Sequence, residues 1–224
     1  MDFKICDKGG KEFLMAIEKF HGWQAPGMVM GGLMVDLALE LLDTFSDPAA
    51  VVETHCFLPD AVQLFTPCTV GNGRLAILNW GKMALTLYDN TTSAGYRIWL
   101  DLIKARSIPS IYNWQMHLAP MQEQRAERLI MDMLTAGHSI LSWRAVPITK
   151  SFGTRIDATM AVCPRCDEAY PAIQGNRCLS CQGKTYFELP EETVAIHPPR
   201  SGQASKSLLP GPDTLYCALS PPPD

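Results

Sequence analysis

Apolar residues recur at helical spacing in three segments of the chain. The first predicts an amphipathic helix over residues 11–20. A long and largely apolar helix begins at Pro26, where the missing N–H of proline costs nothing, and we expect it to lie at the centre of the core. The third segment, residues 120–136, has its apolar side chains on one face and Gly137 as its stop signal.

The middle of the chain alternates between apolar and polar residues in the way that is typical of strands. The predicted strands cover residues 50–54, 75–80, 83–88 and 95–100, with an edge strand over residues 139–148. Asp89-Asn90 opens a turn of the hairpin type, whereas residues 109–120 read as an irregular connector. The pattern predicts an α+β fold in which an antiparallel sheet packs on the long central helix.

One short stretch, ETHCFLPDAVQLFTPCTVGNGR at residues 53–74, concentrates chemically useful side chains. Pro59 opens a short helix, Thr66-Pro67 ends it, and a glycine-rich turn follows. Its two cysteines stand on either side of that helical turn, with an acid and an amide between them. This arrangement suits a metal or redox site, and it equally suits a packed core.

Four of the eight cysteines form two Cys-x2-Cys pairs, Cys163/Cys166 and Cys178/Cys181, separated by eleven residues. Each pair can turn both sulfurs to one side of a tight loop, and four thiolates make the closed tetrahedral set of structural zinc. A pair of disulfides, a redox dithiol and a rubredoxin-type iron site are the alternatives. We therefore predict a small zinc-binding domain of the treble-clef or ribbon type.

The domain organisation follows from these patterns. Residues 1–157 are predicted to be the α+β core and residues 158–190 the four-cysteine domain. Residues 191–224 are rich in proline and small polar residues and are predicted to be a tail without a core of its own.

The composition narrows the function. A chain of 224 residues that is 47% hydrophobic and 19% charged can bury a substantial core. A net charge of −4 argues against nucleic acid as a partner, because phosphate binding needs an excess of Lys and Arg. The N-terminus has no secretory signal pattern, and the longest apolar stretch, Met28–Leu42, is interrupted by Asp36 and Glu40. We expect a cytoplasmic protein without a membrane span.

Four blocks resemble, in the same order, the FmdE family of molybdenum formylmethanofuran dehydrogenase. They are FHGWQAPG at residues 20–27, CFLPDAVQLFTPCTVGNG at 56–73, NWGKMALTLYD at 79–89, and the trailing four-cysteine module. The resemblance implies an α+β core that forms a homodimer, followed by a zinc-finger-like domain. It also suggests a molybdenum or tungsten oxidoreductase as a partner.

The resemblance further implies a polar pocket in the core. The matching residues here are His21, Cys56, Asp60, Gln63, Cys68, Thr69 and Asn72. Trp23 and Ala25 stand where many family members have a second His and a Cys, so two soft ligands are missing. His21, Cys56 and Cys68 can still hold a second metal ion with an open fourth position; a metal-free polar pocket and simple packing are the alternatives.

Three functions remain open from the sequence. The first is a metal-binding accessory protein that works beside a molybdenum or tungsten oxidoreductase. The second is an enzyme of unknown substrate, with Cys56 or Cys68 as nucleophile, or a metal held by His21 that activates water, and Asp60 as acid or base. The third is an interaction protein whose zinc module docks a partner. No pattern in the chain identifies a reaction, so no catalytic residue is assigned.

Overall fold

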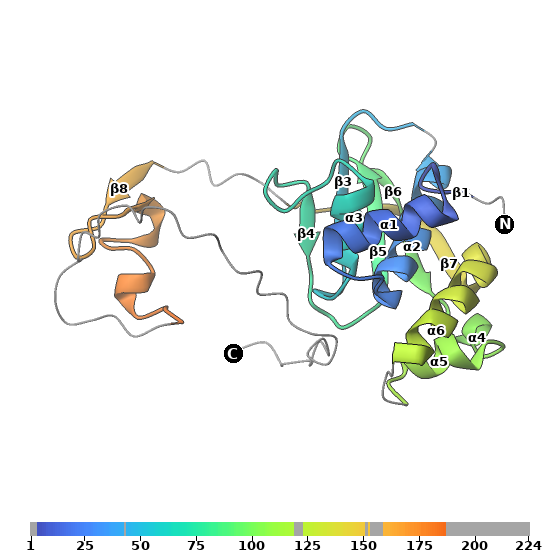
Figure 1. Ribbon diagram of the computed structural model, residues 1–224. Coiled ribbons are helices and arrows are strands. Elements are labelled where there is room, and N and C mark those ends of the chain that lie inside the picture. Colours follow the sequence, from blue (N-terminus) through green and yellow to red (C-terminus); the bar gives the residue numbers. More distant parts are fainter. Residues whose placement is uncertain (1–3, 43, 119–122, 151, 153–158, 187–224) are drawn as a thin grey trace. The chain divides into compact units, whose positions relative to one another are not determined.

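The computed structural model describes residues 4–42, 44–118, 123–150, 152 and 159–186 (Figure 1). The chain divides into two compact units. The described residues of the larger unit lie within 4–152, and those of the smaller unit are 159–186. The predicted domain boundaries and the predicted tail, residues 191–224, fall outside the described residues and stay predictions.

The larger unit mixes helices and strands along the chain. Its elements are β1 (Lys4–Ile5), β2 (Lys8–Gly9), α1 (Gly10–His21), α2 (Pro26–Leu42), β3 (Pro48–Val52), α3 (Leu58–Phe65), β4 (Leu75–Ile77), β5 (Ala84–Asp89), β6 (Ala94–Leu100), α4 (Leu102–Ala105), α5 (Pro109–Gln115), α6 (Glu123–Ala136), the 3-10 helix η1 (Gly137–Ile140) and β7 (Leu141–Pro147). The smaller unit contains β8 (Met160–Val162), β9 (Ala169–Pro171), η2 (Ala172–Gln174) and η3 (Ser180–Gln182).

Five strands form the sheet of the larger unit, in the order β4-β3-β5-β6-β7. The pairs β3/β5, β5/β6 and β6/β7 are antiparallel, as predicted, and β7 is an edge strand. β4, however, runs parallel to β3. The reason is that α3 lies between them in the chain and returns it to the same end of the sheet, as parallel neighbours require. The predicted α+β class is confirmed, with this one parallel pair.

The core lies between α2 and one face of the sheet, and α1, α2 and α3 lie over that face (Figure 1). Alternate strand residues point into this core because successive side chains of a strand face opposite sides. The inward set includes Ala50, Val52, Leu85, Leu87 and Ile98, each at most 1% exposed. α2 is buried over most of its length, as its apolar sequence predicts.

Two glycines of α2 allow α3 and the residue before it to approach closely. A Cβ on Gly31 would lie 2.5 Å from the Cβ of Ala61 in α3, and one on Gly27 would meet the Phe57 ring at 2.3 Å. Only glycine is compatible with such contacts. The small-residue face predicted near the start of α2 therefore serves helix packing, and it fixes the position of α3.

The predicted irregular connector is wrong in one respect, because residues 109–115 form α5. Pro109 occupies its first turn, where proline is favoured. The short α4 before it is capped by Asp101, whose side chain accepts hydrogen bonds from the backbone N–H groups of Ile103 and Lys104. Both signals were present in the sequence, but the segments are too short for a helical period to show.

Within the described residues, no single helix is long and apolar enough to cross a membrane. α1 and α2 reach the required length and apolarity only when taken together, and the two are bent by 120° at the break between them. The cytoplasmic location stays a prediction of the sequence.

Asp89 at the end of β5 fixes the turn to β6. Its carboxylate accepts hydrogen bonds from the hydroxyl and the backbone N–H of Thr91 and from the backbone N–H of Ser46, at 2.5, 2.7 and 2.6 Å. The Thr91 hydroxyl bond, followed by these N–H donors, lowers the pKa of Asp89 to about 2.

We predict that Asp89→Asn lowers the free energy of unfolding at neutral pH. A pKa lowered by folding adds stability above the unfolded pKa of about 3.9, and this stability is lost as the pH falls towards 2. Denaturant titrations between pH 7 and pH 2 should show a deficit in the variant that shrinks below about pH 4. An equal deficit at all pH values would contradict this role for the Asp89 carboxylate.

Candidate functional site

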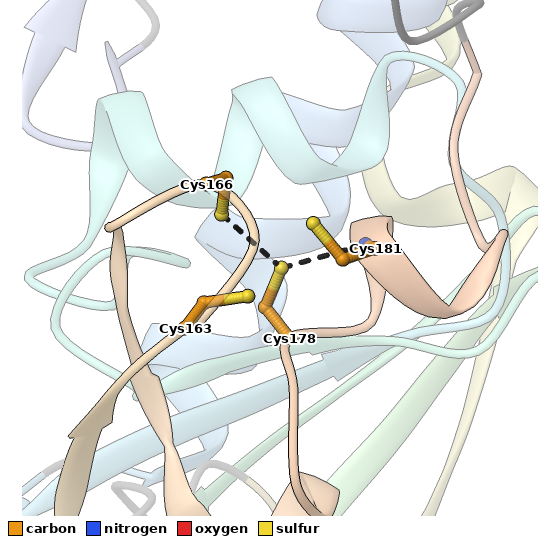
Figure 2. A group of neighbouring side chains, drawn as sticks. All are labelled: Cys163, Cys166, Cys178 and Cys181. Carbon is orange, nitrogen blue, oxygen red and sulfur yellow. Dashed lines mark hydrogen bonds between the residues drawn. The ribbon is translucent and has the colours of Figure 1, made fainter. Parts of the chain in front are cut away.

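The four cysteines of the smaller unit come together at one point, as the spacing predicts (Figure 2). Cys163 follows β8 directly, and Cys181 lies in η3. The four sulfur atoms lie within 4.8 Å of one another, and the Sγ atoms of Cys166 and Cys178 are 3.7 Å apart. Ligands held at about 2.3 Å in a tetrahedron are separated by about 3.8 Å, which is the zinc–thiolate geometry. The residues present therefore fit a zinc ion.

These sulfurs also make up most of the buried interior of the small unit. Cys163, Cys178 and Cys181 are buried, and Tyr170 is buried with them, its hydroxyl donating to the carbonyl of Gly175 at 2.9 Å. So small an apolar core contributes little to folding. A metal bound by the four thiolates is the remaining source of stability for this unit.

The thiols have unequal proton affinities. Backbone N–H groups, first that of Cys178 and then those of Arg165 and Cys166, lower the pKa of Cys163 to about 6. Burial, together with the neighbouring sulfurs, raises the pKa of Cys181 to about 12. Four adjacent thiolates therefore need a cation to compensate their charge, and zinc supplies it.

In the larger unit, His21 and Asp60 form a close pair. His21 is the last residue of α1, and the following Gly22 takes a φ of 94° that turns the chain away. Asp60 lies in the first turn of α3, and its Oδ2 atom is 2.8 Å from Nδ1 of His21. The imidazole also lies beside the rings of Phe57 and Trp23, with centroid distances of 5.6 and 6.4 Å.

Two polar atoms at this place are buried and have no hydrogen-bond partner among the described residues. They are Nε2 of His21 and Nε1 of Trp23. An unpaired buried polar atom costs about 1–3 kcal/mol, so each normally has a partner. The pair offers a donor from the indole and, when Nδ1 of His21 carries the ring proton, an acceptor from the imidazole.

Three of the other predicted pocket residues hold the loop after α3. The side-chain oxygen of Gln63 accepts from the N–H of Val70 at 3.3 Å. Thr69 and Asn72 each accept the other's backbone N–H at 3.0 Å, and Asn72 also donates to the carbonyl of Pro67. In this structure these side chains shape the loop backbone.

The two cysteines of this stretch lie in different surroundings. Cys68 is fully buried in the main apolar core, and burial is the chief cause that raises the pKa of its thiol. Cys56 is partly buried at the bend before α3, where its N–H donates to the Thr54 hydroxyl at 3.1 Å. Cys68 therefore has the surroundings of a packing residue rather than those of a reactive thiolate.

Among the described residues, two groups of three or more His, Cys, Asp or Glu ligands lie close enough to share a metal ion. One is the four-cysteine group. The other is Asp36, Glu40 and His138, which no sequence pattern singled out. His21, Cys56 and Cys68 do not form such a group.

A surface hollow of about 440 Å³ lies at α5 and α6, apart from every predicted site residue. Its walls are Ser107, Ile108, Pro109, Ser110, Arg128 and Asp132. Four of these six side chains are polar, and the apolar walls typical of a small-molecule site are largely missing.

The comparison with known families agrees with this arrangement. The profile of the family described as FmdE, molybdenum formylmethanofuran dehydrogenase operon, matches residues 20–150, and that of the FmdE treble-clef zinc finger matches residues 155–188. The chain belongs to the FmdE family. The predicted zinc-finger domain is thereby identified as the FmdE treble clef, and the resemblance seen in the sequence is confirmed.

Two relatives put this membership in context. The crystal structure of an FmdE-like protein of tungsten formylmethanofuran dehydrogenase from Syntrophus aciditrophicus is 40% identical, covers 84% of this chain and all of that one, and superposes with a TM-score of 0.76. A probable S-adenosyl-L-methionine-binding protein of Archaeoglobus fulgidus is 26% identical over 77% of this chain. The alignment spans only 53% of that longer relative.

We predict that the purified protein carries one zinc ion in the treble clef. Native mass spectrometry should show the mass of one zinc, and Cys178→Ser combined with Cys181→Ser should remove it, because two of four thiolates are lost. Cys68→Ala serves as the control, since Cys68 lies in the other unit, and should keep the zinc. Zinc retained in the double variant would contradict the four-cysteine assignment.

Proposed function

We propose that this FmdE-family protein is an accessory protein of a molybdenum or tungsten oxidoreductase. In this proposal the treble clef contacts the partner, and the His21–Asp60 pocket binds a small polar ligand or a metal ion. The observation that carries the pocket is the pair of buried, unpartnered atoms on His21 and Trp23.

The His21–Asp60 pair supports a binding role because one ring nitrogen is already held. A carboxylate that accepts from Nδ1–H orients the imidazole and leaves Nε2 as the basic atom, which is the usual arrangement behind a ligating histidine. Trp23 adds a donor close to that atom. A ligand with one donor and one acceptor group would satisfy both.

A second metal ion in this pocket is the alternative form of the same proposal. His21 contributes one nitrogen, and zinc requires about three further ligands. Since Cys68 is buried in the apolar core, those ligands would come from the bound molecule, from a partner protein or from rearranged residues. This requirement favours the small polar ligand.

The role of the treble clef in partner contact is supported by its exposed apolar surface. A unit of this size places few apolar side chains inside, and several point to solvent: Met160, Val162, Ile173 and Leu179 are 56%, 67%, 83% and 37% exposed. Exposed apolar side chains that gather on a small domain are typical of interaction surfaces. The printed names of the family and of the Syntrophus relative refer to molybdenum and tungsten formylmethanofuran dehydrogenase, which suggests the class of partner.

The homodimer expected from the sequence is part of this proposal. Among the described strands, β7 borders only β6, and such an edge offers unpaired N–H and C=O groups to another chain. Trp143 on this strand is 49% exposed. Both features support contact with a second copy along the edge.

We predict that Zn²⁺ added to the zinc-loaded full chain changes the imidazole ¹⁵N shifts of His21 in an NMR titration. Asp60→Asn should weaken this binding about tenfold or more, because the carboxylate orients the ring. His55→Ala changes an exposed histidine outside the pocket and should bind as the wild type does. S-adenosylmethionine, suggested by the name of the Archaeoglobus relative, is the second probe. If neither probe changes the His21 signals, the pair has a packing role.

The accessory role predicts direct binding to a purified molybdenum or tungsten formylmethanofuran dehydrogenase. Ile173→Asp should weaken this binding about tenfold or more, because it places a charge on the exposed apolar surface of the treble clef. Met131→Asp is the matched control, since Met131 is an exposed apolar residue of α6 in the other unit. Surface plasmon resonance with the immobilised full chain measures both. No binding, or equal loss in both variants, would contradict the proposed contact.

A further inference from the structure

α2 contains two charged residues, and both are acidic. Asp36 and Glu40 stand four residues apart, so their side chains share one face of the helix. Glu40 lies in the last turn, where the helix dipole is negative and carboxylates are disfavoured. Two carboxylates at this end therefore create a local demand for positive charge.

His138 meets these two carboxylates from a distant part of the chain. It lies in η1, which follows α6, and Gly137 with a φ of 53° turns the chain so that η1 packs on α2. Nε2 of His138 is 3.0 Å from Oδ2 of Asp36, and Nδ1 is 3.6 Å from Oε2 of Glu40. The second distance is too long for a direct hydrogen bond.

A third segment holds Asp36 in place. The backbone N–H of Cys6, in the turn between β1 and β2, donates to Oδ1 of Asp36 at 2.5 Å. This leaves Oδ2 as the oxygen that faces His138. A carboxylate held through one oxygen while the other faces outward is a common arrangement at metal sites.

We infer that Asp36, Glu40 and His138 form a binding site for a first-row divalent cation. One ligand atom from each residue lies within 4.8 Å of the other two. Cis ligands at about 2.1 Å from an octahedral ion are about 3.0 Å apart, which equals the distance between Asp36 and His138. One imidazole and two carboxylates suit Mn²⁺, Fe²⁺, Co²⁺ or Zn²⁺.

The degree of burial fits a site that is completed by water. The side chains of Asp36 and His138 are 15% and 29% exposed, whereas that of Glu40 is 64% exposed. The two inner ligands are thus held by the fold, and Glu40 can close over the ion from the solvent side. Since three protein ligands are available, the remaining positions are open to water or to a substrate group.

Mn²⁺ is the probe that separates this site from the thiolates, because it prefers oxygen and nitrogen ligands. Added to the zinc-loaded full chain, it should broaden the amide NMR signals of the last turns of α2 and of η1 at low stoichiometry. His138→Gln and Glu40→Gln should each weaken this binding about tenfold or more. Glu127→Gln, an exposed carboxylate of α6, should leave it unchanged.

Two results would overturn the inference. One is broadening spread over surface carboxylates, or broadening that His138→Gln does not reduce. The other is no binding at all, which would reduce the cluster to an ion pair between His138 and Asp36. Glu40→Gln keeps the test valid if His138→Gln does not fold, because the Glu40 side chain is largely exposed. Neither variant touches the His21 pocket, so the outcome is separate from that of the proposed function.

Discussion

The burial of α2 is the constraint on which the rest of the larger unit depends. The helix is apolar nearly all round, so it must be covered on all sides. The sheet covers one side, while α1 and α3 cover others. The absence of a side chain at Gly31 lets Ala61 of α3 approach closely. Since α3 carries Asp60 and α1 ends at His21, the packing of α2 also brings these two residues together.

The two units obtain their stability by different means. In the larger unit, apolar area removed from water supplies the dominant favourable free energy. The smaller unit buries little besides its cysteines and Tyr170, and it has to hold four sulfurs whose charges repel one another. A bound cation resolves both problems at once, because it cross-links the two knuckles and neutralises the thiolates. This division explains how so small a unit keeps a fold while exposing apolar side chains.

Local chemistry was enough to predict most of the elements. The long helical periods of α1, α2 and α6 and the alternation in β5 and β6 are repeated over many residues, and such repeats survive the influence of tertiary contacts. The failures are of two kinds. The helix α5 is shorter than the helical period needs to show itself, and the direction of β4 depends on the path of α3 across the sheet.

The candidate sites divide in the same way. The four-cysteine centre was determined by the sequence, because two tight Cys-x2-Cys turns arrange their own sulfurs and need only each other. The pairing of His21 with Asp60 was only implied by family resemblance, since 39 residues separate them and the contact forms when α1 and α3 pack on α2. Only the tertiary structure showed that His138 meets Asp36 across 102 residues. A short spacing constrains ligands directly, whereas residues far apart in the chain meet only where the packing of the core places them.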